Sequence, residues 1–346
     1  MGHEHRQPAT HGTGPLGPWG RHRVCVAPMM DCTDRHARRF LRGFGPEIVL
    51  YSEMVTAAAV LNGDRERLLG FDVAEHPVAL QLGGSDPEEL AAAAQFGAAA
   101  GYDEINLNVG CPSDRVKSGR FGACLMREPD RVAACVAAMR SVVTIPVSVK
   151  CRLGVDDWDS TAHLEAFVDQ VAAAGCSLFI VHARKAILGR LSPRQNREIP
   201  PLQYHRVHAL VTRRPDLEFI INGGLKSVAD AQRQLEHTHG VMLGREAYGR
   251  PEVLAALDAA LLRPGQSPVT AADALARFRP YVLARLAEGV PLHAMTRHLL
   301  GMFSGRPGAR RFRRILSEQA PRAGAGIDVL DRALAAVDPA IARAAA

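Results

Sequence analysis

The sequence has few aromatic residues and no long apolar segment, and each shortage excludes a class of structure. Aromatic side chains make up 5% of the 346 residues, which predicts an interior packed from alanine, leucine and valine. No run of about 18 consecutive apolar residues occurs, so no membrane-spanning helix is expected. Residues 1–22 also lack the apolar core of a signal peptide. Their glycine, histidine, proline and threonine content predicts a disordered N-terminal tail.

Cysteine pairs at metal-binding or redox spacing are missing as well. The seven cysteines are odd in number and scattered, and no Cys-x-x-Cys pair or zinc-ligand spacing occurs. This predicts free thiols, no metal site and a cytoplasmic location. His3, His5 and His11 could bind a metal, but a solvated tail is the simpler interpretation. The net charge of +6 weakly indicates an anionic partner.

From residue 24 onward, short apolar runs alternate with amphipathic, alanine-rich segments. This alternation predicts parallel strands that are each followed by a helix. Eight such units indicate an α/β fold, a closed (β/α)8 TIM barrel. The competing doubly wound sheet would carry a glycine-rich turn after its first strand, where this chain has Pro28, Met29 and Met30. The expected strands are 24–27, 48–51, 78–82, 105–109, 147–150, 178–182, 219–222 and 241–243, and the clearest helices are 87–100, 129–142, 162–174, 202–213 and 228–235.

A different pattern begins where the barrel pattern ends, near residue 262. A short stretch rich in proline and glycine reads as a linker, and segments with apolar residues at helical spacing follow it. These segments, at 271–287, 292–303, 309–319 and 327–342, predict a small all-helical domain. The expected organisation is therefore a tail at 1–22, a barrel at 23–262, a linker at 263–268 and a helical domain at 269–346.

The third segment of the helical domain is dense in arginine. Residues 297–322 contain seven arginines and a single acidic residue, Glu318. Arg310 and Arg313 share one face of the predicted helix, as do Arg311 and Arg314. An arginine on a helix surface is often simply solvated, but this density favours binding of a phosphate backbone.

In a (β/α)8 barrel the active site lies at the C-terminal ends of the strands, and most of the predicted ends turn polar there. The turns after the seventh and eighth strands contain Gly223-Gly224 and Gly244-Arg245. Glycine lets backbone N–H groups approach phosphate oxygens, so these turns predict a phosphate cradle. The other polar residues expected at this end are Ser52, Glu53, Gln81, Asn106, Asn108, Lys150, Arg152, His182, Arg184 and Asn222.

A cysteine follows the fourth predicted strand. Apolar residues alternate there with Asn106 and Asn108, and Gly110 and Pro112 end the strand on either side of Cys111. A thiol can deliver a proton when its pKa suits the task, which makes Cys111 a candidate general acid. The alternative interpretation is a cysteine that is merely buried in a loop.

The residues at this barrel mouth suit a flavin mononucleotide whose phosphate sits in the glycine cradle. Lys150 could place positive charge near the N1–C2 edge of the flavin, and Gln81 and His182 could bond its polar edge. The backbone of Met29 and Met30 could contact one face of the ring. The alternatives are a structural ion pair for Lys150 and a hydrogen-bonded core histidine for His182.

These motifs together resemble the tRNA-dihydrouridine synthase family over about residues 23–335. The matching segments are 26–31 (VAPMMD), 33–35 (TDR), 51–54 (YSEM), 79–84 (ALQLGG), 105–112 (INLNVGCP), 149–150 (VK), 182–184 (HAR), 221–224 (INGG) and 244–245 (GR). Segments 113–116 (SDRV), 196–202 (NREIPPL) and 245–248 (REAY) are similar to the A-type bacterial members, which act on D-loop uridines 20 and 20a. Cys32 departs from the pattern, because many A-type members carry tryptophan there.

The resemblance implies an oxidoreductase that reduces the C5–C6 double bond of tRNA uridines, with bound FMN and with NADPH as a transient reductant. Hydride would pass from reduced FMN to C6, and Cys111 would give the proton to C5 of a flipped-out base. The implied FMN contacts are Pro28, Met29, Met30, Gln81, Lys150, His182, Asn222, Gly223, Gly224, Gly244 and Arg245. The implied tRNA contacts are Asn108 at the base, Arg184 and Lys185 at the uracil or a phosphate, and Arg194, Arg197, Arg310 and Arg313 at the backbone. The resemblance also implies a monomer without an obligate protein partner.

Two other functions stay open at this point. An FMN-dependent barrel oxidoreductase of a free small molecule, similar to dihydroorotate dehydrogenase, would share the fold and the cofactor but would need no arginine-dense domain. A non-enzymatic RNA-binding protein would not need Cys111, Lys150 and His182 around one barrel mouth.

Overall fold

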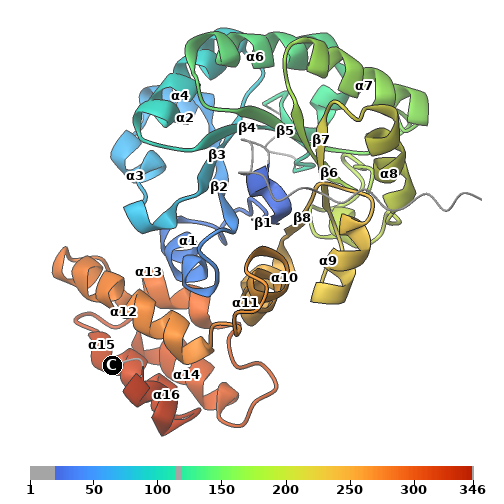
Figure 1. Cartoon of the computed structure of the whole chain (residues 1–346). Helices are drawn as coiled ribbons and strands as arrows, with labels where there is room; N and C mark the ends of the chain where they lie inside the picture. Colours follow the sequence, from blue (N-terminus) through green and yellow to red (C-terminus); the bar gives the residue numbers. More distant parts are fainter. Residues whose placement is uncertain (1–19, 114–118, 345–346) are drawn as a thin grey trace, which may run out of the picture.

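Eight parallel strands close into a barrel in the order of the chain (Figure 1). The structure is a computed structural model that describes residues 20–113 and 119–344, so most of the predicted tail and its three histidines lie outside the described residues. The strands are β1 (Val24–Val26), β2 (Val49–Thr56), β3 (Val78–Gly83), β4 (Glu104–Val109), β5 (Val147–Arg152), β6 (Leu178–His182), β7 (Glu218–Asn222) and β8 (Gly240–Leu243). All eight predicted strands are present, and the predicted TIM barrel is confirmed.

Helices cover the outside of the barrel because each buries one apolar face against the strands. In α4, for example, Asp86 caps the first turn, Pro87 occupies the first helical position, and Leu90 and Ala93 face inward. Gly97 of this helix lies so close to β3 and β4 that an added Cβ would come within 2.6 Å of Leu80 Cδ2. The surrounding helices are α1 (Arg35–Leu41), α2 (Ala57–Asn62), α3 (Arg65–Leu69), α4 (Pro87–Ala99), α6 (Pro129–Val142), α7 (Thr161–Ala173), α8 (Tyr204–Arg213), α9 (Val228–Leu235), α10 (Arg245–Gly249) and α11 (Glu252–Leu257).

The second strand is longer than the sequence predicts. Ser52 and Glu53 are expected to follow the strand, but β2 continues through both of them to Thr56. The register against β3 shifts between Tyr51 and Met54, which is the mark of a β-bulge. The bulge lets the chain resume pairing after the polar pair, so polarity does not mark the end of this strand.

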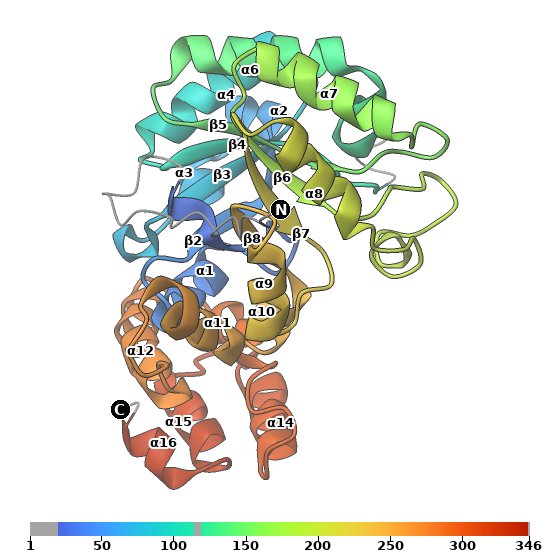
Figure 2. The same cartoon turned by 45° about the vertical axis from the view of Figure 1, so that its right-hand side comes forward.

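The C-terminal helices form a second unit below the barrel (Figures 1 and 2). Its helices are α12 (Ala271–Ala287), α13 (Leu292–Thr296), α14 (Ala309–Gln319), α15 (Ile327–Ala335) and α16 (Pro339–Ala344). The single helix predicted at 327–342 is divided, because Pro339 starts a new helix instead of continuing α15. Within the described residues, no helix is long and apolar enough to cross a membrane.

The helical unit is joined to the barrel through α1. Phe278 of α12 lies against Phe40 of α1, with 5.3 Å between the ring centroids. Asp34, which caps α1, accepts a bond of 2.6 Å from Arg297 and lies 3.0 Å from His298 Nε2. Apolar packing and a small charged cluster therefore both hold the two units together.

Ionisable side chains close the floor of the barrel, at the N-terminal ends of the strands. His22 is 4% exposed although it belongs to the predicted tail, and its Nε2 lies 2.6 Å from Glu104 Oε2. Its Nδ1 lies 3.8 Å from Glu218 Oε1. Burial raises the pKa of Glu218 to about 7; the nearby His22 opposes this shift and Glu104 adds to it. The domain boundaries stay predictions, but His22 is part of the barrel floor.

Glu218→Gln is expected to become increasingly stabilising as the pH rises. The unfolded chain releases the Glu218 proton near pH 4.5, whereas the folded protein keeps it until about pH 7. The wild type therefore loses stability between these two values, by about 3 kcal/mol, and the variant does not. Urea unfolding at pH 4.5 and pH 8 measures this difference. Glu47→Gln, at an exposed position, serves as the control, and a gain from Glu218→Gln that is equal at both pH values contradicts the prediction.

Candidate active site

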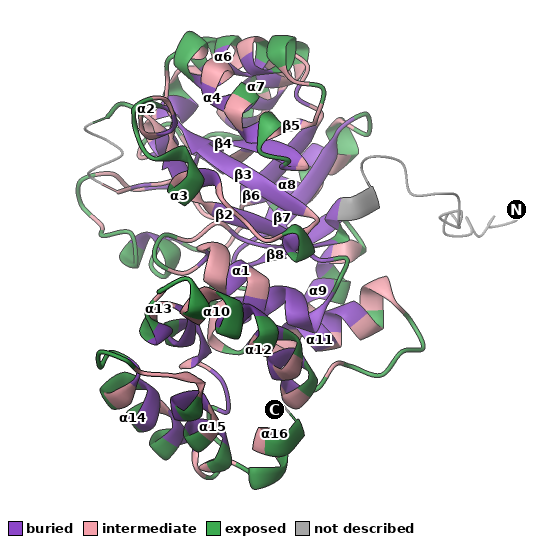
Figure 3. Ribbon diagram, turned by 90° about the vertical axis from the view of Figure 1, so that its left-hand side faces the viewer, coloured by how far each residue is buried: buried purple, intermediate pink, exposed green. Residues whose placement is uncertain are grey.

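Alternate residues of neighbouring strands bring polar side chains together at the C-terminal mouth of the barrel. Asn108 of β4 lies opposite Lys150 of β5, and His182 of β6 lies opposite Asn222 of β7. Lys150 Nζ is 3.3 Å from Asn222 Oδ1. Figure 3 shows these strands as the buried centre of the molecule. Residues that lie far apart in the sequence therefore meet around a single opening.

The loop that carries Cys111 is held by hydrogen bonds on both sides. The backbone N–H groups of Gly110 and Cys111 donate to Asn108 Oδ1 at 3.2 and 3.0 Å. Arg152 Nε donates to the carbonyl oxygen of Gly110 at 2.9 Å. The thiol is half-buried, and its sulfur lies 3.6 Å from Ser113 Oγ. Cys111 is thus a fixed and accessible thiol at the mouth, not a residue of the packed core.

Arg152 is expected at the mouth from the sequence, but the structure assigns it a role that was not predicted. Besides Gly110, its guanidinium donates to the carbonyl oxygens of Lys185 at 3.1 Å and Asn196 at 3.0 Å. It is 3% exposed, so one buried charge fastens the β4 loop to the long β6–α8 loop. Its position two residues after Lys150, on the same face of β5, is the only sequence signal for this role.

Lys150 and His182 sit in a buried and positively charged environment. Burial, reinforced by Arg152, lowers the pKa of Lys150 to about 8. Burial and the charges of Arg152 and Lys150 hold the pKa of His182 well below its ordinary value, so this imidazole is neutral. Among the described residues, no carboxylate forms an ion pair with Lys150 and no hydrogen bond engages the His182 ring. The His182 ring nitrogens, and the Lys150 hydrogens that its bond to Asn222 does not use, remain for another group at the mouth.

The turn after β7 has a backbone that only glycine accommodates. Gly223 and Gly224 have φ values of +118° and +73°. A Cβ on Gly223 would lie 2.8 Å from His182 Cδ2, and one on Gly224 would lie 2.5 Å from Leu202 Cδ1. Tyr204 Oη donates to the carbonyl oxygen of Gly223 at 2.6 Å and fixes the turn. The result is a rigid turn with bare backbone next to the histidine.

The loop after β1 lies beside the turn after β8, because these two strands are neighbours in the barrel. Met29 N donates to Thr33 Oγ1 at 2.9 Å, and Cys32 N donates to the carbonyl oxygen of Met29 at 3.1 Å. Met29 packs against the interior of the barrel, and a Cβ on Gly244 would lie 3.4 Å from its sulfur. Met30 is 52% exposed, so the two methionines differ in position.

The sequence profile of the dihydrouridine synthase family (Dus) matches residues 25–338, which include the barrel and most of the helical unit. The chain belongs to the dihydrouridine synthase family. Two similar proteins named tRNA-dihydrouridine(20/20a) synthase come from Xanthomonas campestris pv. campestris, at 56% identity over 94% of this chain and 96% of the relative, and from Yersinia pestis, at 50% over 96% and 95%. A third, from Escherichia coli K12, is 52% identical over 90% of both chains.

In this dihydrouridine synthase family member, a glutamate on the β6–α8 loop engages two of the predicted arginines. Glu198 forms an ion pair of 2.6 Å with Arg245 and lies 3.5 Å from Arg194. Arg245 begins α10 beside Gly244 and is thus tied to this loop. Arg184 donates to the carbonyl oxygens of Glu198 and Pro200, and Arg197 is exposed on the same loop. The loop therefore gathers basic side chains at the rim of the mouth.

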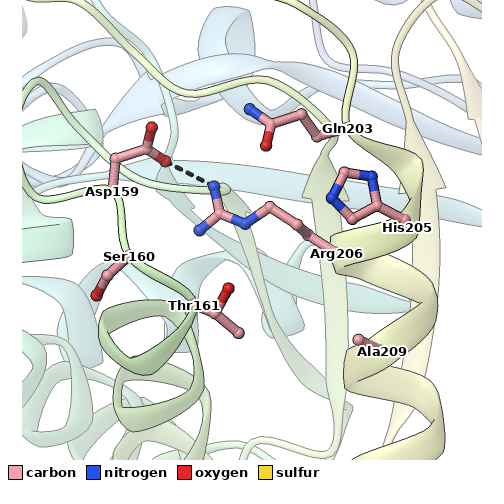
Figure 4. A pocket seen from close by; sticks show the side chains of 7 residues that line it. All are labelled: Asp159, Ser160, Thr161, Gln203, His205, Arg206 and Ala209. Atoms are coloured by element: carbon pink, nitrogen blue, oxygen red, sulfur yellow. Dashed lines mark hydrogen bonds and ion pairs between the residues drawn. The ribbon is translucent and has the colours of Figure 1, made fainter.

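Lys185 and Arg184 are adjacent in the chain and both are predicted tRNA contacts, but their side chains contact different parts of the structure. Its Nζ lies 3.1 Å from Asp159 Oδ2, at the start of α7. Asp159 also accepts a bond of 2.7 Å from Arg206. Asp159 and Arg206 line the pocket shown in Figure 4, which has a volume of about 370 Å³. No predicted site residue lines this pocket, which is formed by Asp159, Ser160, Thr161, Gln203, His205, Arg206 and Ala209.

The arginines of α14 lie on the helical unit and not at the mouth. One face of α14 is buried through Phe312, Ile315 and Leu316, and the burial along this helix is coloured in Figure 3. The other face leaves Arg310, Arg311 and Arg314 exposed and Arg313 half-buried. None of these arginines forms an ion pair with a described residue. A cluster of uncompensated positive charge therefore stands below the barrel.

Proposed function

We propose that this chain is a tRNA-dihydrouridine synthase that uses FMN and NADPH to reduce D-loop uridines at positions 20 and 20a. The observation that carries the proposal is the fixed thiol of Cys111 at the same barrel mouth as Lys150 and the neutral His182. The relatives named above support tRNA as the substrate class, because they match the chain over nearly its whole length.

The residues at the mouth offer the positive charge and the hydrogen-bond donors that FMN would need. Gly223 and Gly224 leave the backbone beside His182 without side chains, and its N–H groups can donate to a phosphate. Among the described residues, no hydrogen bond engages the ring of the neutral His182, and Lys150 donates only to Asn222 Oδ1, which leaves it further hydrogens for a ligand. The remaining residues proposed to hold the group are Pro28, Met29, Met30, Gln81, Asn222, Gly244 and Arg245. When bound and reduced by NADPH, FMN would supply the hydride that C6 of the uracil accepts.

The protein's own part is to orient the base and to move one proton. Asn108 Nδ2 can donate to a carbonyl oxygen of the uracil with the hydrogen that its bond to Gln81 does not use. The Cys111 thiol gives its proton to C5, and the thiolate takes up a proton from water before the next turnover. Hydride at C6 and a proton at C5 together saturate the double bond. Arg184, Lys185, Arg194 and Arg197 are proposed to contact the tRNA around the mouth.

The helical unit supplies a second tRNA surface. The exposed arginines of α14 have no acidic partner among the described residues, which suits a phosphate backbone. A small substrate would need no such surface, so it favours tRNA over a free molecule. We also propose that the enzyme is a monomer, as the resemblance to the A-type members implies, and that it is cytoplasmic, as its free thiols indicate.

The proposal is tested by anaerobic flavin absorbance. The purified protein is reduced with NADPH, excess reductant is removed, and tRNA from a strain that lacks the modification is added. We expect the absorbance of oxidised flavin to return with unmodified tRNA and not with fully modified tRNA. A bound flavin that neither tRNA reoxidises would instead favour oxidation of a free small molecule, and a protein without flavin would favour simple RNA binding.

A further inference from the structure

A row of buried hydrogen bonds runs through the barrel from its floor to its mouth. It begins at the carboxylate of Glu104, whose Oε1 accepts from the hydroxyl of Tyr51 at 2.9 Å and from that of Ser148. Glu104 Oε2 faces His22. The members of the row are Glu104, Ser148, Asn106, Gln81 and Asn108. Each of these side chains is at most 7% exposed, so water competes little for their hydrogen bonds.

Three adjacent strands supply the row because their inward-facing residues are in register. Asn106 of β4 lies opposite both Gln81 of β3 and Ser148 of β5. Asn106 Nδ2 donates to Ser148 Oγ, Gln81 Nε2 donates to Asn106 Oδ1, and Asn108 Nδ2 donates to Gln81 Oε1. Each of these three distances is 2.7 Å. The row then ends at the backbone N–H groups of Gly110 and Cys111, which Asn108 Oδ1 accepts.

The carboxylate at the floor sets the direction of the row from below, and the backbone N–H groups of Gly110 and Cys111 require the same direction from above. A hydroxyl has one hydrogen, and Ser148 gives it to Glu104, so Ser148 can only accept from Asn106. The Asn106 amide must then turn its oxygen to Gln81, and Gln81 must turn its oxygen to Asn108. Asn108 is left with its oxygen facing the Cys111 loop. A reversed amide at Asn108 would set N–H against N–H and release the loop.

The same order determines which groups face the mouth. Asn108 Oδ1 is occupied by two backbone N–H groups, while Asn108 Nδ2 and Gln81 Nε2 each keep one unused hydrogen. The unused hydrogens of the row are thus N–H donors, which suit carbonyl oxygens of a uracil or a flavin.

We propose that Glu104, Ser148 and Asn106 are positioning residues that act through Gln81 and Asn108 to set the Cys111 loop. None of the three reaches the mouth, and the sequence gives Glu104 and Ser148 no role. The effect on catalysis rests on the proposed function. The effect on the Cys111 loop is independent of the proposed function, because it depends only on the order of the hydrogen bonds in the row.

Two single-hydroxyl deletions separate this role from a general loss of packing. Ser148→Ala removes the donor that links Glu104 to the row. Tyr51→Phe is the matched control, because it removes a donor from the same oxygen of Glu104 without interrupting the row. Both side chains are fully buried, so each deletion perturbs the interior of the barrel. Glu104→Gln adds a conservative variant, since its amide oxygen can still accept from Ser148.

The loop is measured first, by hydrogen exchange of peptides that contain Gly110 and Cys111 in the flavin-loaded protein. Ser148→Ala is expected to speed exchange of these amides at least 10-fold, whereas Tyr51→Phe and Glu104→Gln leave it unchanged. The two half-reactions are then timed. Ser148→Ala is expected to slow flavin reoxidation by saturating tRNA on the order of 10- to 100-fold and to leave flavin reduction by NADPH and the KM for tRNA within about 3-fold.

The outcomes are distinct. Unchanged exchange in Ser148→Ala, or equal exchange in Ser148→Ala and Tyr51→Phe, overturns the proposal. Faster exchange without slower reoxidation overturns the positioning role. If the wild type is not reoxidised by tRNA at all, the proposed function fails, but faster exchange in Ser148→Ala alone still supports control of the loop by the row. If Ser148→Ala does not fold, Asn106→Leu replaces it, because it removes both the donor to Ser148 and the acceptor for Gln81. Faster exchange is then the supporting result, and unchanged exchange overturns the proposal.

Discussion

Replacing Cys111 with alanine is expected to abolish most tRNA reduction while flavin binding and flavin reduction by NADPH persist. The thiol lies at the mouth on a loop whose backbone is held by Asn108 and Arg152, so removing the sulfur leaves those bonds in place. Loss of a general acid typically costs about 10²- to 10⁴-fold in rate. We expect the rate of flavin reoxidation by tRNA to fall within that range.

The two half-reactions are measured separately by stopped-flow absorbance, with flavin content checked beforehand. Cys124→Ala is the matched control, since Cys124 is also a half-buried thiol but donates to the carbonyl oxygen of Phe121 at 3.1 Å. It should keep the wild-type rates. Full tRNA reduction by Cys111→Ala would remove the cysteine from the mechanism, and an equal loss in both half-reactions would point to a disturbed flavin site.

The barrel could be predicted from the sequence because its strands are buried on both sides. A strand such as β6, with Phe179, Ile180 and Val181 fully buried, reads as a short continuous apolar run. Eight such runs, each followed by a helix pattern, leave few alternative folds. The same logic placed Asn108, Lys150, His182 and the two glycines at one mouth, because parallel strands all end on the same side.

Long-range pairing between loops could not be predicted in the same way. Nothing in the spacing of Glu198 and Arg245 indicates that they form an ion pair, because the β6–α8 loop must first fold across the barrel mouth. Lys185 and Arg184 are neighbours in the chain, yet Asp159 draws only Lys185 toward α7. The bulge in β2 was also hidden, since a polar pair within a strand has the same pattern as a pair at its end.

The row from Glu104 to Asn108 shows a further limit of sequence patterns. Alternation places Glu104, Asn106 and Asn108 on one face of β4, but alternation alone does not say that this face points into the barrel. Only the register with Gln81 and Ser148 makes a continuous row of them. Polar residues within a barrel strand thus have a role that depends on their neighbours in other strands.

Removing positive charge from α14 is expected to weaken tRNA binding without changing chemistry at the mouth. The change is the triple substitution Arg310→Gln, Arg311→Gln and Arg314→Gln, at three exposed positions. Each arginine that meets a phosphate releases bound counterions, so three contacts are worth roughly 10- to 100-fold in kcat/KM at moderate salt. Arg313→Gln alone should have a smaller effect than Arg310→Gln, because Arg313 is half-buried.

The measurement is kcat/KM for tRNA over a range of salt concentrations. The logarithmic salt dependence should become shallower by about 2 to 3, while flavin reduction by NADPH and the rate at saturating tRNA stay constant. A triple variant at Arg23, Arg67 and Arg140, which are exposed on the barrel, removes the same charge elsewhere. If both variants lose equal activity, overall charge and not α14 attracts the tRNA. If only the α14 variant loses activity and its salt dependence flattens, the helix contacts phosphates directly.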